Sequence, residues 1–191
     1  KIEKTIEKPT LISVDNSFET VIFRGVNNGY NFRDFNKFII GSKIKNDITN
    51  NEIIISKSLS DKLKISVGQI LTLYFQVNNN QRIPNVRSFN VSYIYETDFP
   101  DYDNNYIIGN LETLQNVYKW SKNDYANIEI SIEDKSQISL IEKSISLLSS
   151  FEKNNLSTKT VQSKYTNIFS WISIFDFNIL IITFLMILVA I

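Results

Sequence analysis

The sequence predicts an α+β fold followed by a helix that enters a membrane. Short segments of alternating apolar residues, typical of strands, are interspersed with amphipathic helical segments. Ala126–Val161 has the order strand, helix, strand, which indicates a split βαβ unit. Glu52–Val117 is richer in strands. We therefore expect a β-rich part inserted into an α+β frame.

The C-terminal segment supplies the membrane prediction. From Phe177 to Ile191 it contains no charge, no Gly and no Pro, and only Asn178 and Thr183 are polar. At 1.5 Å per residue this run covers ~22 Å, less than the ~30 Å of the hydrocarbon core. We therefore expect the chain to stop inside the bilayer, as a fragment of a longer membrane protein. The alternative is a soluble core helix, which would keep a solvent face that residues 179–182 lack.

A seam of apolar residues precedes and enters this run. Its members are spaced alternately by four and three residues, the a/d pattern of a helix that packs on a partner helix. The pattern predicts one long stalk helix from Val161, with Tyr165 and Trp171 at the membrane interface. The seam consists of Val161, Tyr165, Ile168, Ile172, Phe175 and Ile179.

Composition excludes several classes of function. The 191 residues include 20 basic and 20 acidic side chains, so the chain has no electrostatic footprint for nucleic acid. It contains no Cys and no His, which removes disulfides, thiolate metal sites and the commonest general base. The five glycines form no nucleotide-binding loop. The sequence therefore predicts neither an enzyme nor a cofactor site.

The local patterns predict the following elements in chain order. Strands are expected at Ile2–Ile6 and Thr10–Val14, separated by Pro9, and at Phe18–Val26, Glu52–Ser56, Ile70–Val77, Val86–Tyr95, Ala126–Glu133 and Ser157–Val161. Helical segments are expected at Asp34–Ile40, Lys57–Leu63, Leu111–Val117 with Asn110 as N-cap, and Gln137–Leu148.

The patterns of carboxylate and hydroxyl side chains predict neither a metal site nor a catalytic site. Asp101–Glu112 spaces its oxygens like a calcium-binding EF-hand loop, but Tyr106 replaces the required Gly, so coincidence is the better interpretation. Glu129 and Glu133 alternate with isoleucines and are expected on the solvated face of their strand. The serines at 56, 58 and 60 lack a base that would activate a nucleophile.

Three stretches carry a family resemblance: EIIISKSLSDKLKISVGQILTLYF, RIPNVRSFNVSYIYETDF and YIIGNLETLQNVYKW. In this order they resemble the periplasmic core domain of FtsX-like ABC transporter permeases, which is MacB-like, and most closely the lipoprotein-releasing LolC/LolE branch. The ending IFSWISIFDFNILIITFLMILVAI is similar to that family's entry into its second transmembrane helix.

The resemblance implies a bacterial inner-membrane permease subunit whose domain faces the periplasm. A first transmembrane helix would precede Lys1 and two more spans would follow Ile191. ATP hydrolysis would belong to a separate ATPase subunit, and a second permease subunit would complete a homo- or heterodimer. The domain would divide into a porter-like part at 1–50 and 122–161, an inserted β-rich part at 51–121, and the stalk and start of the transmembrane helix at 162–191.

The resemblance also implies a candidate partner site. LolC carries a hook that recruits the periplasmic carrier LolA, and the matching polar loop here is Asn78–Asn85. The candidate docking residues are Asn79, Gln81, Arg82, Ile83 and Pro84. An ordinary solvent loop is the alternative, since long loops are often but not always functional.

Other functions remain open beside release of lipoproteins to a LolA-like carrier. A MacB-like exporter permease would move peptides or drugs, and an FtsX-type regulator would bind a cell-wall hydrolase. An extracytoplasmic sensor domain of a receptor would also precede a membrane helix, and would be followed by signalling segments rather than by two more spans.

Overall fold

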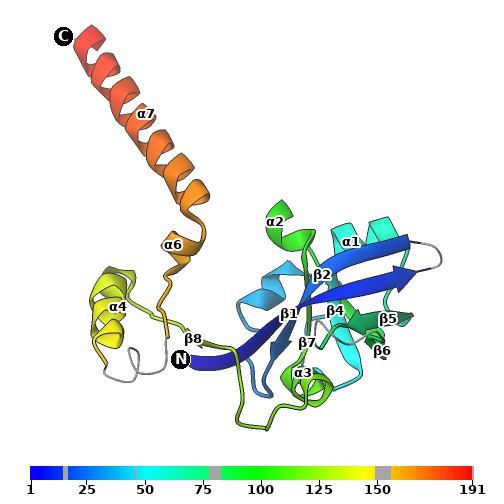
Figure 1. Ribbon diagram of the computed structural model, residues 1–191. Helices are drawn as coiled ribbons and strands as arrows, with labels where there is room; N and C mark the ends of the chain where they lie inside the picture. Colours follow the sequence, from blue (N-terminus) through cyan, green and yellow to red (C-terminus); the bar gives the residue numbers. More distant parts are fainter. Residues whose placement is uncertain (15–16, 46, 78–82, 149–155, 191) are drawn as a thin grey trace. The chain divides into compact units, whose positions relative to one another are not determined.

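Six strands of the chain pair in a closed ring. In the computed structural model, which describes residues 1–14, 17–45, 47–77, 83–148 and 156–190, the ring runs β1–β2–β7–β4–β6–β5 and back to β1 (Figure 1). The pairs β2–β7 and β4–β6 are parallel and the other four are antiparallel. The ring strands are β1 (Ile2–Val14), β2 (Ser17–Val26), β4 (Glu52–Ser56), β5 (Ile70–Phe75), β6 (Asn85–Tyr95) and β7 (Tyr106–Asn110).

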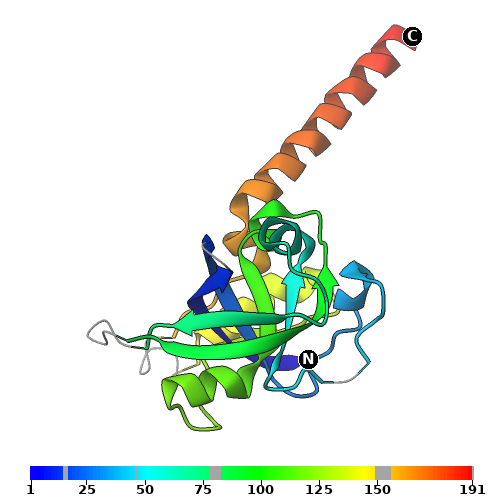
Figure 2. The same ribbon diagram turned by 90° about the vertical axis from the view of Figure 1, so that its right-hand side faces the viewer.

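Two short strands extend this ring. β3 (Ile39–Ile40) pairs with β6, and β8 (Asn127–Ile130) pairs with the first residues of β1. The helical elements of this part are η1 (Phe35–Phe38), α1 (Lys57–Leu63), α2 (Pro100–Asp103) and α3 (Leu111–Tyr118), and Figure 2 shows α3 below the strands. Mixed sheet and helices together confirm the predicted α+β class.

Aromatic and aliphatic side chains fill the ring. The rings of Phe23, Phe75 and Phe89 are fully or almost fully buried, with centroids 5.6 to 6.3 Å apart. Tilted and edge-on contacts of this kind add to the free energy gained from burial. Gly109 lies against the same cluster, since a Cβ built on it would stand only 2.3 Å from Cζ of Phe23.

The strand β4 is buried on both sides, as its unbroken EIIIS sequence predicts. Ile53 and Ile55 belong to the cluster inside the ring. Ile54 belongs to a second cluster on the outer side, which the 27–48 segment covers with Phe32 and Ile44. A strand covered on both faces reads as a continuous apolar run rather than an alternating one.

The helix caps agree with the local sequence. The Asn110 side chain accepts a hydrogen bond from the backbone N–H of Glu112 at 2.8 Å, which confirms the predicted N-cap of α3. Ser56 caps α1 in the same way, accepting from the N–H of Leu59 at 3.1 Å. The predicted bounds of α1 are confirmed.

The predicted break at Pro9 is wrong, because β1 is continuous. Ile22, which faces Pro9, donates its N–H to Asn105 O, away from β1. Pro9 is therefore in a non-hydrogen-bonded pair with Ile22, and its missing N–H faces the opposite edge of β1. That edge pairs with β8 at residues 2–5 and with β5 at residues 11–13, so Pro9 lies between the two ladders.

The segment Ile132–Ile191 forms a separate unit from Lys1–Ser131. It contains η2 (Lys135–Gln137), α4 (Ile138–Ser146), α6 (Val161–Lys164) and α7 (Thr166–Ala190). Residues 156–160 form no strand, so the second strand of the predicted split βαβ unit is wrong for the part of the chain described. The proposed division at 1–50, 51–121, 122–161 and 162–191 stays a prediction.

The predicted single stalk helix is interrupted at Tyr165, whose φ of −120° and ψ of 44° separate α6 from α7. Within α7, Ile168–Val189 is long enough and apolar enough to cross a membrane, judged by length and composition. Its 22 residues span ~33 Å. The apolar helix thus begins before Phe177 and reaches the thickness of a hydrocarbon core, contrary to the shorter estimate from the charge-free run.

Candidate functional site

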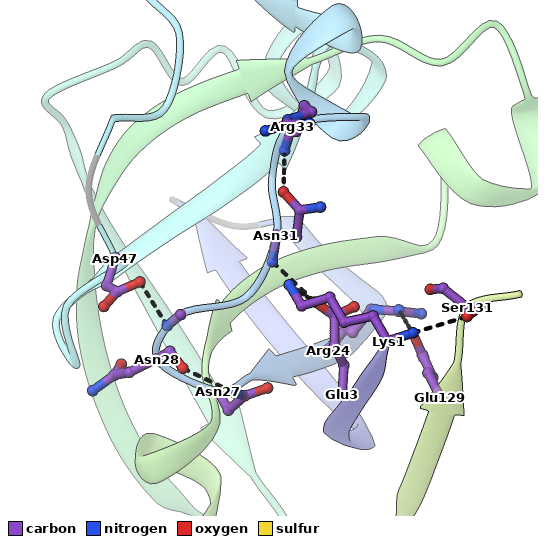
Figure 3. Close-up of polar contacts among 11 residues, drawn as sticks. Lys1, Glu3, Arg24, Asn27, Asn28, Asn31, Arg33, Asp47, Glu129 and Ser131 are labelled. Atoms are coloured by element: carbon purple, nitrogen blue, oxygen red, sulfur yellow. Dashed lines mark hydrogen bonds and ion pairs between the residues drawn. The ribbon is translucent and has the colours of Figure 1, made fainter. Parts of the chain in front are cut away.

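The first and last residues of the unit Lys1–Ser131 lie side by side. β8 pairs antiparallel with β1, from Ile2 opposite Ile130 to Thr5 opposite Asn127. The Lys1 amino group donates to Ser131 O at 2.9 Å, and Ser131 N donates back to Lys1 O at 2.8 Å (Figure 3). The chain therefore leaves this unit, on the way to α7, beside Lys1.

The β1–β8 pair exposes its isoleucine face to solvent and partly buries the face that carries Glu129, which is the reverse of the prediction. Ile2, Ile128 and Ile130 lie on one face and are 69%, 52% and 44% exposed. Glu129 was expected on a solvated face, but it points to the other side and pairs with an arginine. The prediction for Glu129 is wrong because β2 places a buried cation opposite this face, which the local alternation could not indicate.

That cation is Arg24, the centre of an ion-pair cluster that we define as Glu7, Arg24 and Glu129. Arg24 Nη2 lies 2.6 Å from Glu129 Oε2, and Nη1 lies 3.2 Å from Glu7 Oε1. The side chain of Arg24 is only 13% exposed. The Thr5 hydroxyl also donates to Glu129 Oε1, at 3.4 Å. The cluster thus joins β1, β2 and β8.

Tyr30 and Tyr102 border the ion-pair cluster. Burial raises the pKa of both phenols above their ordinary value, although Arg24 opposes the shift. Burial also works against the charge on Arg24. The neighbouring phenol oxygens and carboxylates outweigh it, so the pKa of Arg24 lies above its ordinary value. Arg24 therefore carries its charge at neutral pH.

A second set of contacts connects β1 to the 27–33 loop. Glu3 is buried and its Oε1 accepts from Asn31 N at 3.0 Å and from Lys1 Nζ at 2.8 Å (Figure 3). Further along, Asp47 accepts from Gly29 N at 2.8 Å. These bonds fix the loop against the sheet beside the ion-pair cluster.

An open pocket of about 790 Å³ lies over this loop. Its lining includes the rings of Tyr30 and Phe32 and the charged side chains of Arg33, Lys45 and Asp47. The pocket holds no acid–base pair beside a nucleophile, and within the described residues no group of three acidic or sulfur-bearing side chains could hold a metal.

The carboxylates of the EF-hand-like stretch make separate contacts. Asp103 is buried and accepts from both the N–H and the hydroxyl of Thr97, at 2.6 to 3.2 Å. Glu112 instead contacts Asn50 and Lys122. Asp103 therefore stabilises a turn of the backbone.

The predicted docking loop is only partly described. Asn79, Gln81 and Arg82 lie outside the described residues. Ile83 and Pro84 are exposed immediately before β6, with Ile83 75% exposed. The role of this loop in carrier docking stays a prediction.

The predicted stalk seam is divided between two helices. Val161 lies in α6 and Tyr165 at the interruption, while the other members lie in α7. Ile168, Ile172, Phe175 and Ile179 are between 36% and 62% exposed. The face is thus apolar and accessible, and its packing against a second helix stays a prediction.

Sequence analysis missed Arg24 and Glu7. A signal was present, because Arg24 interrupts an apolar strand sequence, FETVIFRGV. A charged side chain in a strand buried on both faces requires a partner of opposite charge. The identity of that partner depends on strand pairing across the fold and could not be obtained from local sequence.

Comparisons with known proteins identify the fold. Neither a protein-family model nor a curated protein sequence matches the chain. The extracellular domain of the noncanonic ABC-type transporter YknZ from Gram-positive bacteria is similar, with 18% identity and a TM-score of 0.51, covering 74% of this chain and 70% of that one. The periplasmic region of MacB from Actinobacillus actinomycetemcomitans has 17% identity and a TM-score of 0.52, covering 79% of this chain and 66% of that one. At these identities the likeness shows the fold.

Proposed function

We propose that this chain is the extracytoplasmic part of an ABC transporter permease subunit, together with a membrane helix that follows it. The observation that carries the proposal is the combination of this fold with Ile168–Val189 in one chain. The same fold forms the extracellular domain of an ABC-type transporter in YknZ. The membrane would be the bacterial inner membrane, with the domain in the periplasm.

The proposed mechanism is mechanical. A separate ATPase subunit would hydrolyse ATP, and two permease subunits would pair as a homo- or heterodimer. Movement of the membrane helices would pass along α7 to the extracytoplasmic domain. A helix transmits such movement only where its apolar face is packed against a neighbour, which is the role we assign to the seam.

Alanine is too mild a test of the seam, so we choose Ile168→Asp and Ile172→Asp. The matched control is Ile174→Asp, because Ile174 lies off the seam by about 120° on a helix with 3.6 residues per turn. All three variants place one carboxylate in α7 and meet the same obstacle to membrane insertion. In the full permease, reconstituted with its ATPase, the two seam variants should hydrolyse ATP without transport and the control should transport. Normal transport by the seam variants would refute the mechanism.

The proposed substrate is a lipoprotein released from the inner membrane to a LolA-like periplasmic carrier. Support comes from the sequence resemblance to LolC/LolE and from the exposure of Ile83 at the end of the candidate loop. A photo-crosslinking residue at position 83 should capture the carrier, and deletion of residues 79–82, which keeps the crosslinking residue, should abolish the capture. A crosslinker at Ile40 is the control, because Ile40 is also exposed but belongs to β3 and not to the candidate docking loop.

A MacB-like exporter is the second candidate, favoured by the fold likeness to the periplasmic region of MacB. It predicts no carrier capture at position 83 and co-purification with an outer-membrane channel. Carrier capture in the same preparation would instead favour lipoprotein release.

A further inference from the structure

We propose that the ion-pair cluster Glu7–Arg24–Glu129 couples β8 to the strand ring, so that Arg24 transmits displacement of β8 to β2. This inference rests on the proposed function and deepens it, by assigning a positioning residue within the extracytoplasmic domain. It gives a role to a partly buried charge network that lies within the unit Lys1–Ser131.

The first step is that little besides the cluster holds β8. It is four residues long, and in the described part of the chain it pairs with β1 alone. Ile128 and Ile130 remain 52% and 44% exposed, so burial of apolar surface contributes little. Beyond the backbone ladder, the main attachment is Glu129, which accepts from Arg24 and Thr5.

The second step is that Arg24 reaches a different part of the ring. Among the described residues β8 pairs through its backbone with β1 alone, and β1 pairs in turn with β2. Arg24 belongs to β2, which pairs on its other side with β7, so its side chain gives β8 a second and direct link to β2. Arg24 faces Glu7 on β1 and also binds Glu129 on β8. A force on β8 therefore acts on β1 through hydrogen bonds and on β2 through the guanidinium.

The third step is that the connection is stiff. Separating a partly buried ion pair leaves a charge that water compensates only in part, which costs more than separating a fully exposed pair. The side chains of Arg24, Glu7 and Glu129 are 13%, 23% and 35% exposed. By contrast, the Lys122–Glu112 pair is 90% and 40% exposed and contributes little.

β8 is the last strand before the residues that lead to α7, so a stiff connection at β8 can transmit movement between them. β8 ends beside Ser131, and the following residues lead to α7. Lys1, the residue before β1, is bonded to Ser131. Any movement that reaches the domain along the chain thus arrives at β1 and β8, which are the strands that Arg24 clamps.

The test uses the full permease with its ATPase in vesicles. Glu129→Gln keeps the shape of the side chain and removes its charge. The control is Glu19→Gln, which removes the ion pair of Glu19 with Lys62, at 2.8 Å, between β2 and α1. We expect Glu129→Gln to lower transport per ATP hydrolysed several-fold and to leave hydrolysis intact, and Glu19→Gln to do neither.

A second measurement follows β8 directly. Hydrogen–deuterium exchange of the amides at 127–131 should be about tenfold faster in Glu129→Gln, without a matching change inside the ring. Unchanged exchange at β8 would refute the clamp whether or not the protein transports. If the wild type transports nothing with any ATPase, the proposed function fails, and this proposal of coupling fails with it.

A disulfide separates coupling from general stability. These 191 residues contain no cysteine, so within them a cysteine pair at positions 4 and 128 has no other partner. The two positions are directly opposite each other. Their neighbours Glu3 and Glu129 continue the hydrogen-bonded register of Lys1 and Ser131, so 4 and 128 form the closer, non-hydrogen-bonded kind of pair. This bond ties β8 to β1 and does not replace the link to β2. In Glu129→Gln, Lys4→Cys/Ile128→Cys should therefore restore slow amide exchange at 127–131 when oxidised, without restoring transport per ATP hydrolysed. Recovery of both with the disulfide formed would overturn the role of Arg24.

Discussion

Gly109→Ala tests how tightly the strand ring is packed. A Cβ at this position would lie 2.3 Å from Cζ and 2.9 Å from Cε1 of Phe23, whereas ordinary contact begins at 3.4 Å. The Phe23 ring would have to move by about 1.1 Å. It is fully buried, with the rings of Phe75 and Phe89 at 5.7 and 5.6 Å, so it has no free direction in which to move.

The expected cost follows from two opposing effects. Overpacking a closed core costs about 1–3 kcal/mol, whereas replacing Gly by Ala stabilises by about 0.4–1 kcal/mol through the unfolded chain. We therefore expect Gly109→Ala to reduce the free energy of unfolding by about 1–2 kcal/mol. Urea unfolding of the chain in detergent, followed by circular dichroism, measures it.

A double variant gives the control. Phe23→Leu alone leaves a cavity and destabilises, but it also removes the ring atoms that the new methyl group would strike. The pair Gly109→Ala/Phe23→Leu should thus be less destabilised than the sum of the single variants. Additive losses, or a Gly109→Ala chain as stable as the wild type, would refute this account of the packing.

Two further variants probe polar contacts of the same unit. Asn110→Ala should lower stability by about 2–4 kcal/mol, since it removes the cap of α3 and leaves Ile48 O without the 2.7 Å donor. Asn110→Ser, whose hydroxyl can keep the cap without reaching Ile48 O, should lose less, and equal losses in urea unfolding would contradict this division. Glu52 accepts from Thr49 N at 2.9 Å, and this backbone hydrogen bond holds the pKa of Glu52 below its ordinary value. Its contribution is complete above pH 4.5 and is lost as pH falls through the lowered pKa, so the stability difference between the wild type and Glu52→Gln should shrink in acid. A difference that stays constant from pH 7 to about pH 2 would exclude this linkage.

Local signals were sufficient for β4, α1 and the start of α3, but not for α2 or β7, which the local patterns did not predict. The bounds of β4 and α1 follow from the change from a β-branched run to a capped amphipathic segment, and Asn110 marks the start of α3. Each of these signals acts over a few residues. The closure of six strands into one ring depends on pairings between distant segments, and no single segment encodes it.

Two of the errors, at Pro9 and Glu129, share one physical origin, which is that the surroundings of β1 and β8 depend on strands far away in the sequence. Pro9 was expected to end a strand, but it is tolerated where the edge of β1 lies between two partners. Glu129 was expected in solvent, but its environment is set by Arg24 on a strand that is more than a hundred residues away along the chain. The candidate docking loop and stalk seam were derived from resemblance and periodicity, and they await the experiments above.

The exposed position of β8 explains why an ion-pair cluster, rather than apolar packing, attaches its side chains to the ring. Inside the ring, buried phenylalanines and isoleucines hold the strands together. Their apolar contacts stabilise the ring but prefer no particular direction. At β8 the isoleucines are half exposed, so apolar burial cannot secure the strand. A guanidinium that bridges two carboxylates through two different nitrogens fixes both distance and orientation, and it does so at the junction between the ring and the strand that leads on to α7. Replacing the cluster by apolar side chains of similar size could therefore preserve the fold, but it would remove the directional link that coupling requires.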